Sequence, residues 1–304
     1  MGTEEDQLEK IMPSALSNDP VYIIGNPRSG TSLLRLMLTC HPEVVIPPEG
    51  HFFLWLEAKF GEKDFPETAQ QFIDELVTTK KFETWGIKKQ ALQELFSECA
   101  PQKFRDAVAL VYCSYGILKG RSEFRYWGDK NKLWKDKLHS VLRYFPNSKF
   151  VHIVRDGRDV ACSIKELSAR EMHTFKYGPR MPDNIYNIAE HWATNVTFIQ
   201  KYIATLQPNQ HITVRYEDLI LSPRQTLTEV AGFLQLEFSE SMLDYARRNR
   251  DEKLEPEETM QWKLKLNGEL EKANIGKFQS LLTEHEVAIF EKRCEEILKY
   301  YGYK

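Results

Sequence analysis

The sequence predicts an α/β fold in which helices cover a doubly wound parallel sheet. Short apolar runs with the length of buried strands occur at residues 21–24, 44–46, 149–154 and 211–216. Segments of helical periodicity separate these runs, and strands that alternate with helices form parallel sheets. The first run leads into a glycine-containing turn and then a helix, which is the order of elements around a phosphate-binding loop.

The first elements have clear start and stop residues. Residues 21–24 (VYII) form an apolar strand that a glycine closes. Residues 31–40 carry closely spaced leucine and methionine side chains and stop before Pro42, as a largely buried helix does. Residues 44–46 then predict a second strand, because a pair of prolines ends the run.

The middle of the chain repeats this alternation. Residues 65–119 are expected to be helical, because their apolar side chains recur at helical spacing. The runs KFVHIV at 149–154 and HITVRY at 211–216 predict two further strands, and helices are expected after them at about 157–168 and 223–235. These strand–helix pairs extend the parallel sheet.

The last third of the chain combines clear helices with one irregular segment. Residues 185–203 place apolar side chains on one helical face, and Thr283 with Glu286 forms a capping-box pattern that opens the last helix. Residues 250–280 are charged and poorly periodic. A loop of that length inside a compact domain is usually functional or disordered.

Composition and charge exclude several classes of protein. The chain has 304 residues, with 41 Lys and Arg against 44 Asp and Glu, and its net charge is −3. Because this balance gives no global basic field, we expect no nucleic-acid partner and no membrane partner. The start, MGTEEDQLEK, lacks an apolar secretory segment, and no apolar run approaches the roughly 18 residues of a membrane span.

The five cysteines are widely separated, odd in number and without the spacing of metal ligands. Five reduced thiols are typical of a cytoplasmic protein, which is the location we expect. Because no repeat or linker divides the chain, we expect a flexible N-terminal segment over residues 1–20 and a single domain over 21–304. The sequence leaves the oligomeric state open.

A phosphate-binding loop is the most informative segment. Gly25, Gly30, Thr31 and Ser32 have the spacing of a P-loop and lie between the first strand and its helix. Backbone N–H groups of such a loop bind an anion, and Arg28 adds a guanidinium suited to phosphate or sulfate oxygens. The predicted fold is therefore P-loop NTPase-like.

Two features separate this loop from that of a nucleotide triphosphatase. The lysine that reaches the outer phosphates of ATP or GTP would stand where Thr31 is. The strand at 149–154 is followed by Arg155, which suits a phosphate better than it suits a Mg²⁺ site. We therefore expect a phosphorylated nucleotide to bind without Mg²⁺-assisted phosphoryl transfer, and we expect no metal.

These residues resemble the paired motifs of the sulfotransferases that use 3′-phosphoadenosine 5′-phosphosulfate (PAPS). The motifs NPRSGTS and VHIVRDGRDVACS follow or contain two of the strands, and the resemblance extends over residues 21–304. It implies that Arg155 and Ser163 hold the 3′-phosphate. It implies that the 5′-phosphosulfate is held by the first motif, through Arg28, Ser29, Gly30, Thr31 and Ser32.

Further assignments follow from the same resemblance. Arg28, where the cytosolic branch of the family has lysine, places the chain nearer the tyrosylprotein, carbohydrate and bacterial branches. Tyr216 is similar to a family tyrosine that contacts the nucleotide, and Gly276 with Lys277 resembles a C-terminal segment that closes over the 3′-phosphate. The helical region at about 60–120 is assigned to acceptor binding.

Glu49 is a candidate general base. It follows the second predicted strand, and neighbouring strand ends in a parallel sheet share one crevice, so we expect Glu49 near the P-loop. Its position resembles that of the catalytic glutamate of tyrosylprotein sulfotransferases. His51 is the rival base, because a neutral imidazole suits proton abstraction near pH 7.

Lys130, in the segment YWGDKNKLW, is the candidate for the charge that develops during sulfuryl transfer. The resemblance implies that it contacts the leaving phosphate oxygen, where a preorganised cation offsets negative charge. Lys132 is an alternative for this role. The residues around Lys130 depart from the family wording, which leaves its partner open.

The sequence thus predicts a PAPS-dependent sulfotransferase that acts on a small-molecule acceptor and releases adenosine 3′,5′-bisphosphate. The acceptor group is a hydroxyl, amine or guanidine. Phe52, Phe53, Trp55, Trp85 and Trp127 are expected near the crevice, which suggests a small or partly apolar acceptor. The alternatives are a P-loop small-molecule kinase and a non-catalytic nucleotide-binding regulator.

Overall fold

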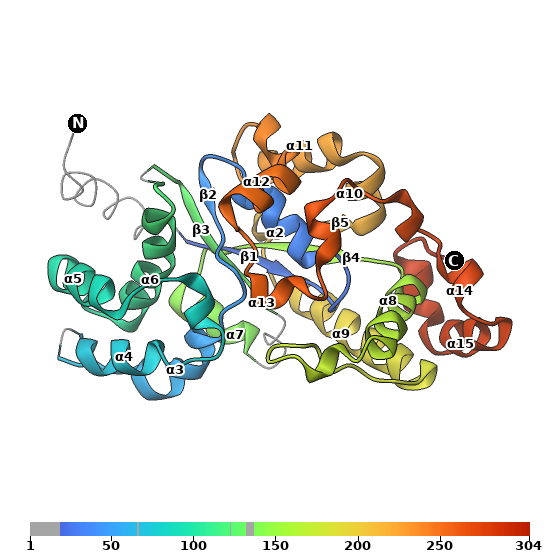
Figure 1. The fold of residues 1–304 in the computed structure, drawn as a ribbon, viewed down its shortest axis with the longest axis horizontal. Coiled ribbons are helices and arrows are strands. Elements are labelled where there is room, and N and C mark those ends of the chain that lie inside the picture. Colours follow the sequence, from blue (N-terminus) through green and yellow to red (C-terminus); the bar gives the residue numbers. More distant parts are fainter. Residues whose placement is uncertain (1–18, 66, 122, 132–136) are drawn as a thin grey trace. The chain divides into compact units, whose positions relative to one another are not determined.

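A computed structural model describes residues 19–65, 67–121, 123–131 and 137–304 (Figure 1). These residues form two compact units. Unit 1 contains the chain up to Tyr22 and Arg35–Lys149, and unit 2 contains Ile23–Leu34 and Phe150–Lys304. Most of the N-terminal segment that the sequence predicts to be flexible, residues 1–18, lies outside the described residues.

The strands of unit 1 are parallel and short. β2 (Val44–Val45) pairs with β3 (Tyr126–Lys130), with Val44 opposite Tyr126. The first half of β1 (Val21–Ile24) follows β3 in the strand order. A Cβ atom on Gly128 would lie 2.3 Å from the carbonyl oxygen of Val21, so this strand position requires glycine.

Helices supply the rest of unit 1, over an aromatic core. α3 to α6 pack on one another along the blue-to-green part of the ribbon (Figure 1). The elements are α3 (Phe52–Phe60), α4 (Ala69–Leu76), η1 (Phe82–Trp85), α5 (Lys89–Cys99), α6 (Phe104–Leu118) and α7 (Leu138–Tyr144). Phe52, Trp85, Tyr112 and Trp127 are fully buried, and Tyr112 stacks on Trp127 at a centroid distance of 4.8 Å.

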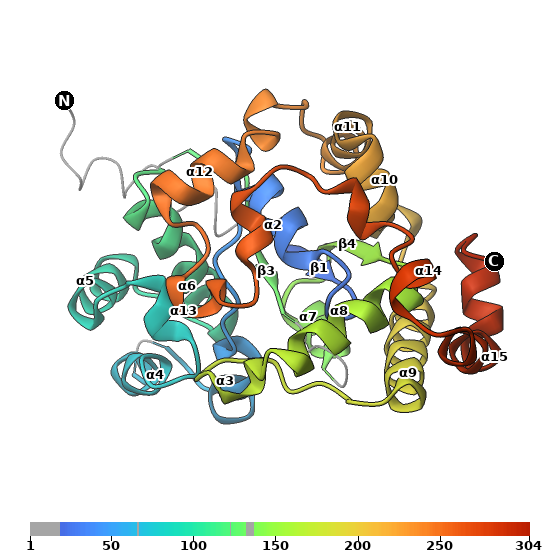
Figure 2. The ribbon, with the colours of Figure 1, turned by 45° about the vertical axis from the view of Figure 1, so that its right-hand side comes forward.

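In unit 2 the second half of β1 precedes β4 (Lys149–Val154) and β5 (His211–Arg215) in the strand order. β4 and β5 are parallel, with Phe150 opposite His211 and Val154 opposite Arg215. The larger helices are α8 (Gly157–Ala169), α9 (Ile185–Ile203), α10 (Tyr216–Leu221), α11 (Pro223–Phe233) and α15 (Glu284–Tyr300). α9 lies between α8 and α15, as Figure 2 shows. Trp192 of α9 packs against Phe290 of α15 in the core of this unit.

The charged segment near residues 250–280 folds into short helical turns. They are α12 (Tyr245–Glu252), α13 (Glu257–Met260), η6 (Leu264–Asn267), η7 (Lys272–Asn274) and α14 (Phe278–Leu281). Further single turns are η3 (Met172–Thr174), η4 (Pro208–Gln210) and η5 (Glu240–Met242). In the described ranges, no helix is both long and apolar enough to span a bilayer.

The predicted α/β class with a parallel sheet is confirmed. The strand at 149–154 and the helix at 185–203 lie where the sequence places them, and α2 (Thr31–Thr39) ends one residue earlier than expected. The sequence did not predict β3, α3 or α7. Tyr216 was expected to end a strand, and it begins α10 instead.

Candidate functional site

The phosphate-loop motif ends in a tight turn before α2. Gly30 has a φ of 95°, and a Cβ atom there would lie 2.6 Å from the ring of Tyr216, so only glycine fits. α2 begins at Thr31 and has no acidic residue in its first turn. The unsatisfied N–H groups and the positive end of the helix dipole at this position favour an anion.

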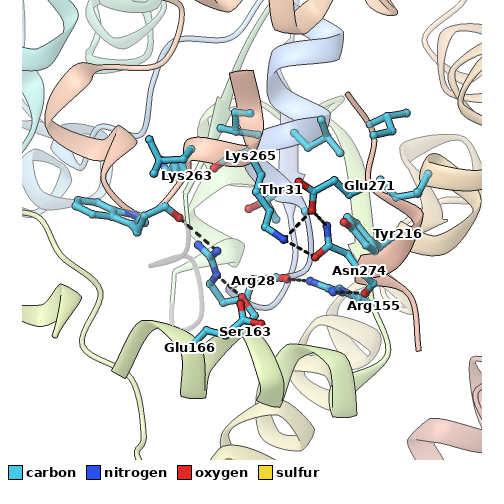
Figure 3. Close-up of a pocket in the computed structure, with 18 of the residues that line it drawn as sticks. Arg28, Thr31, Arg155, Ser163, Glu166, Tyr216, Lys263, Lys265, Glu271 and Asn274 are labelled. Carbon is cyan, nitrogen blue, oxygen red and sulfur yellow. Dashed lines mark hydrogen bonds and ion pairs between the residues drawn. The ribbon is translucent and has the colours of Figure 1, made fainter. Parts of the chain in front are cut away.

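A cavity of about 330 Å³ opens over this loop in unit 2 (Figure 3). Its wall is formed by the loop, by α8, by α10 and by the segment from Trp262 to Lys277. The basic side chains that line it outnumber the acidic ones: Arg28, Arg155, Arg170, Lys263, Lys265 and Lys277 against Glu166, Glu269 and Glu271. The cavity is therefore suited to a negatively charged ligand.

Arg28 lines the cavity, and its contacts with the described residues are with uncharged oxygens. Its Nε donates to Ser163 Oγ at 3.1 Å, and one terminal nitrogen donates to the carbonyl oxygen of Trp262 at 3.4 Å (Figure 3). Burial and then the charge of Arg155 lower the pKa of the Arg28 guanidinium to about 10. An anion beside Arg28 would reverse this unfavourable effect.

Arg155 is buried beside the same loop. Its terminal nitrogens donate to the carbonyl oxygens of Arg28 at 3.2 Å and Asn274 at 2.6 Å, and its guanidinium lies 4.4 Å from the ring centre of Tyr216. Its Nε is buried without a hydrogen-bond partner in the described structure. Neither Arg155 nor Arg28 forms an ion pair with a carboxylate of the described residues.

The segment 262–278 is fastened to the cavity wall by charged groups. The Asp159 carboxylate accepts the backbone N–H groups of Gly276 at 2.8 Å and Phe278 at 3.0 Å. Lys277 pairs with Glu166 at 2.7 Å, and Lys265 bridges Glu271 at 2.7 Å and Asn274 at 2.8 Å (Figure 3). These contacts hold the basic segment over the loop.

A second polar cluster lies within unit 1. The Glu49 carboxylate receives Lys81 Nζ at 2.9 Å and His51 Nε2 at 3.0 Å on Oε1, and Lys130 Nζ at 2.9 Å on Oε2. The side chains of the three donors are at most 7% exposed. Lys130 lies on β3, His51 immediately precedes α3, and Lys81 immediately precedes η1.

Asp129 precedes Lys130 on β3 and is buried. Because successive side chains of a strand point to opposite faces, Asp129 lies on the face opposite to Lys130. Tyr112 donates to its Oδ2 at 2.7 Å, and its Oδ1 has no hydrogen-bond partner in the described part of the chain. Burial raises the pKa of the Asp129 carboxyl to about 7, against the opposing influence of Tyr112 and Lys130.

The comparison with protein families decides what these clusters belong to. A family model described as "Sulfotransferase family" matches residues 20–240, which is more than half of the chain. The chain belongs to the sulfotransferase family. The matched range includes the phosphate-loop motif, the motif that contains Arg155, and the residues of the Glu49 cluster.

Several curated proteins resemble this sulfotransferase over about three quarters of its length. A protein-tyrosine sulfotransferase 2 of Gallus gallus is 24% identical, over 74% of this chain and 53% of that protein. A putative protein-tyrosine sulfotransferase of Caenorhabditis briggsae is 26% identical, over 74% of this chain and 68% of that protein. The chain thus spans from about half to two thirds of these two relatives.

Solved sulfotransferases share the fold at low sequence identity. The sulfotransferase domain from the curacin biosynthetic pathway has a TM-score of 0.58 and 18% identity, over 92% of this chain and 97% of that one. The domain from the Synechococcus PCC 7002 olefin synthase has a TM-score of 0.57 and 21% identity, over 90% and 94%. Mouse sulfotransferase SULT7A1, solved in complex with PAP, has a TM-score of 0.52 and 12% identity, over 98% and 94%.

Most of the residues that the sequence predicts to bind the donor are found in the wall of this cavity. They are Arg28, Gly30, Thr31, Ser32, Arg155, Ser163, Tyr216 and Lys277. Ser29 does not, and its hydroxyl is buried without a hydrogen-bond partner among the described residues. Gly276 contributes its N–H group to Asp159 instead. Lys132, the alternative to Lys130, lies outside the described residues.

Four of the five aromatic residues that the sequence associates with an acceptor lie in the core of unit 1. Phe52, Phe53, Trp85 and Trp127 are at most 2% exposed and form the core of unit 1. Trp55 is the exception, because 54% of it is exposed and its ring lies 5.8 Å from that of His51. The apolar surface of the four is thus used in packing the helical region, and their place near a crevice stays a prediction.

Sequence reasoning missed several functional candidates. Asp159, Asn274 and Lys81 reach the two clusters through contacts with residues far away in the chain, and Lys265 reaches the donor cavity through its contact with Asn274. Nothing in their local sequence marks them, except that Lys265 and Asn274 lie in the charged segment singled out as irregular. In the described parts of the chain, no group of His, Cys, Asp and Glu is arranged to hold a metal ion.

Proposed function

We propose that this chain is an enzyme that transfers the sulfuryl group of PAPS to a small-molecule acceptor and releases adenosine 3′,5′-bisphosphate (PAP). The observation that carries the proposal is that Arg28 and Arg155 line one cavity and that, within the described ranges, each donates to neutral oxygens and to no carboxylate. Buried cations without carboxylates are costly unless an anion completes the site. A donor with phosphate groups at both ends of its ribose supplies that charge.

The donor roles follow from the contacts in unit 2. Arg28 and the first turn of α2 would hold the 5′-phosphosulfate, while Arg155, Ser163 and the backbone near Lys277 would hold the 3′-phosphate. A fold neighbour solved with PAP supports this choice of donor. Tyr216, whose ring packs against Gly30 and Arg155, would contact the nucleotide. The proposal needs no metal, because guanidinium and ammonium groups meet the donor's charge.

The chemistry is a single displacement at sulfur. An acceptor oxygen forms the new O–S bond while the bond from sulfur to the bridging phosphate oxygen breaks, and its electron pair stays on the phosphate of PAP. Glu49 takes the acceptor's proton, and Lys130 stabilises the charge on the leaving oxygen. His51, which contacts Glu49 Oε1, is the alternative base.

The acceptor is proposed to be a hydroxyl, amine or guanidine of a small molecule. The half-exposed ring of Trp55, beside His51, offers an apolar surface to part of it. Because relatives are named protein-tyrosine sulfotransferases, a tyrosyl peptide is the second acceptor class to test. We also propose a cytoplasmic location, since Cys99, Cys113, Cys162 and Cys294 are free thiols and the last three are buried.

A screen of acceptors with sulfur-labelled PAPS tests the proposal. Phenols, alcohols, amines, guanidines and tyrosyl peptides are each incubated with the purified chain, and Arg28→Ala serves as the donor-site control. We expect label to pass to a small acceptor with release of PAP, and to be lost in the control. Tight PAP binding without transfer to any acceptor would support the nucleotide-binding regulator. Transfer of the terminal phosphate of ATP would support the kinase.

A further inference from the structure

Lys81 has no role in the donor site or in the base assignment, yet it is buried against the reacting cluster. Only 7% of its side chain is exposed, and its Nζ lies 2.9 Å from Glu49 Oε1. It approaches the oxygen that His51 also contacts, whereas Lys130 contacts Oε2. Lys81 therefore fixes one side of the carboxylate and leaves the other side to Lys130.

The backbone at Lys81 is held in an unfavourable conformation. Its φ is 71°, in the left-handed region, which is unfavourable for a residue with a Cβ atom. The surrounding turn is hydrogen-bonded: Phe82 N donates to the carbonyl oxygen of Thr79 at 3.1 Å, and Thr84 N donates to that of Lys81 at 3.0 Å. Glycine would fit this backbone better. Lys253 shares the left-handed backbone, and what distinguishes Lys81 is its buried contact with Glu49.

The proposed chemistry gives Lys81 such a use. Lys130 has to turn from Glu49 toward the leaving oxygen as the bond to sulfur breaks. Glu49 would then lose the contact of Lys130 with Oε2, the oxygen to which we assign the acceptor proton. The ammonium of Lys81 on Oε1 would still offset the charge of the buried carboxylate, and a nearby cation favours the ionised form.

We propose that Lys81 is a positioning residue for Glu49: it stays on Oε1 throughout turnover and keeps the carboxylate ionised, with Oε2 directed at the acceptor. This inference rests on the function proposed above. Among the described residues, Lys81, Lys130 and His51 contact Glu49, and Asp129 acts on it through its charge. Of the two ammonium groups, Lys130 is assigned to the leaving oxygen and Lys81 is assigned no contact with donor, acceptor or leaving group.

The test compares Lys81→Met with Lys81→Arg in the full chain. Lys81→Met should lower kcat at least tenfold near neutral pH and move the acid limb of the kcat–pH profile to higher pH, because the loss of a neighbouring cation favours the protonated carboxyl. Lys81→Arg should recover most of kcat and the original limb. PAP affinity, measured by calorimetry, should change less than twofold in both variants.

Lys253→Met is the matched control. Lys253 also has a left-handed backbone, with φ of 50°, and it pairs with Glu257 at 2.7 Å, but its side chain is 70% exposed. Its replacement should leave kcat and the acid limb unchanged. Lys81→Gly removes the ammonium while relieving the backbone, so it replaces Lys81→Met in the comparison if that variant does not fold.

A readout without turnover separates this inference from the proposed function. Carbon NMR of side-chain-labelled glutamate, with the Glu49 signal assigned by its loss in Glu49→Gln, follows the protonation of Glu49 directly. A higher titration midpoint in Lys81→Met supports the inference, and an unchanged midpoint overturns it. A uniform loss of kcat at every pH, not recovered by arginine, also overturns it. If the unmodified chain transfers sulfate to no acceptor, the proposed function fails instead.

Discussion

The two units arrange their charges in opposite ways. In unit 2, Arg28 and Arg155 donate to one hydroxyl and three backbone carbonyls, so an arriving anion breaks no ion pair between them and the part of the chain that the structure describes. In unit 1, the Glu49 carboxylate already receives three donors at 2.9–3.0 Å. Open cations suit the binding and release of a charged donor, whereas a fully bonded carboxylate suits a reacting group that must be held still.

The comparison also concerns how each region is stabilised. The donor cavity is bounded by a segment in which Lys277 and Lys265 pair with the exposed or partly exposed Glu166 and Glu271. The Glu49 cluster lies against the aromatic core of unit 1, where its donors are almost fully buried. Changes in the first region should therefore alter ligand affinity, and changes in the second should alter turnover or stability.

The largest effect is expected at the base. Glu49→Gln keeps the shape of the side chain and removes its proton affinity, so kcat should fall roughly 10²–10⁴-fold. PAP affinity should stay nearly unchanged, because the groups proposed to bind the donor are intact. Both are measured with one acceptor and saturating donor, so that lost binding is not mistaken for lost chemistry.

His51→Ala is the informative partner of that variant. It should cost much less in kcat, and the acid limb of the pH profile should vanish only in Glu49→Gln. An inactive His51→Ala beside a near-normal Glu49→Gln would reverse the two roles. Normal activity of both would place the base elsewhere.

A smaller effect, on stability, is expected at Asp129. Burial raises the pKa of this carboxyl to about 7, well above that of an unfolded chain, so the folded state retains a proton that the unfolded state loses. The stability it contributes is complete below about pH 4 and is lost as the pH rises through about 7. Because Asn does not titrate, Asp129→Asn should remove this pH dependence. The loss of unfolding free energy between pH 4 and pH 8 should be about 4 kcal/mol smaller in the variant than in the unmodified chain, from roughly three pKa units at about 1.4 kcal/mol each.

Urea denaturation at the two pH values measures this difference. Asp183→Asn, at an exposed carboxylate, is the control and should show no comparable change. If the free energy of unfolding depends on pH equally in Asp129→Asn and in the unmodified chain, Asp129 is ionised in the folded protein. Asp129 would then no longer support the contrast between the open donor cavity and the buried cluster.

The smallest effect is expected from metal removal. Because arginine and lysine groups meet the donor's charge in this account, EDTA should leave the rate of sulfuryl transfer unchanged within error. The assay compares initial rates with and without the chelator. An absolute requirement for Mg²⁺ would contradict the donor assignment and favour nucleoside triphosphate chemistry.

Much of the fold could be predicted from strong local patterns. The run KFVHIV became β4 with the expected bounds, and the long apolar stripe of 185–203 became α9, because periodicity over many residues leaves few alternatives. β3 was missed because YWGDK contains glycine and aspartate, and its strand conformation comes from its neighbours in the sheet. α3 was missed because FFLWLEAKF is apolar on nearly every face.

The residues of the candidate site also fall into those that the sequence predicts and those that it misses. Arg28, Arg155 and Ser163 stand in motifs next to strand ends, so their sequence context predicted a shared cavity in advance. Lys81 and Asp159 act through side-chain contacts with Glu49, 32 residues away, and with Gly276, 117 residues away. Such pairs depend on packing rather than on local spacing, and a single sequence does not contain that information.

The central claim is that Arg155 binds the 3′-phosphate of the donor. Ligand affinities of Arg155→Ala, measured by calorimetry, test it most directly. PAP and PAPS should bind more weakly by roughly 1.5–3 kcal/mol, about 10–150-fold in Kd, while adenosine 5′-phosphosulfate, which lacks the 3′-phosphate, should bind as before. Arg170→Ala, which removes an exposed charge from the same cavity wall, controls for general electrostatics and should weaken all three ligands slightly and equally. Equal large losses for all three ligands in Arg155→Ala would contradict the account.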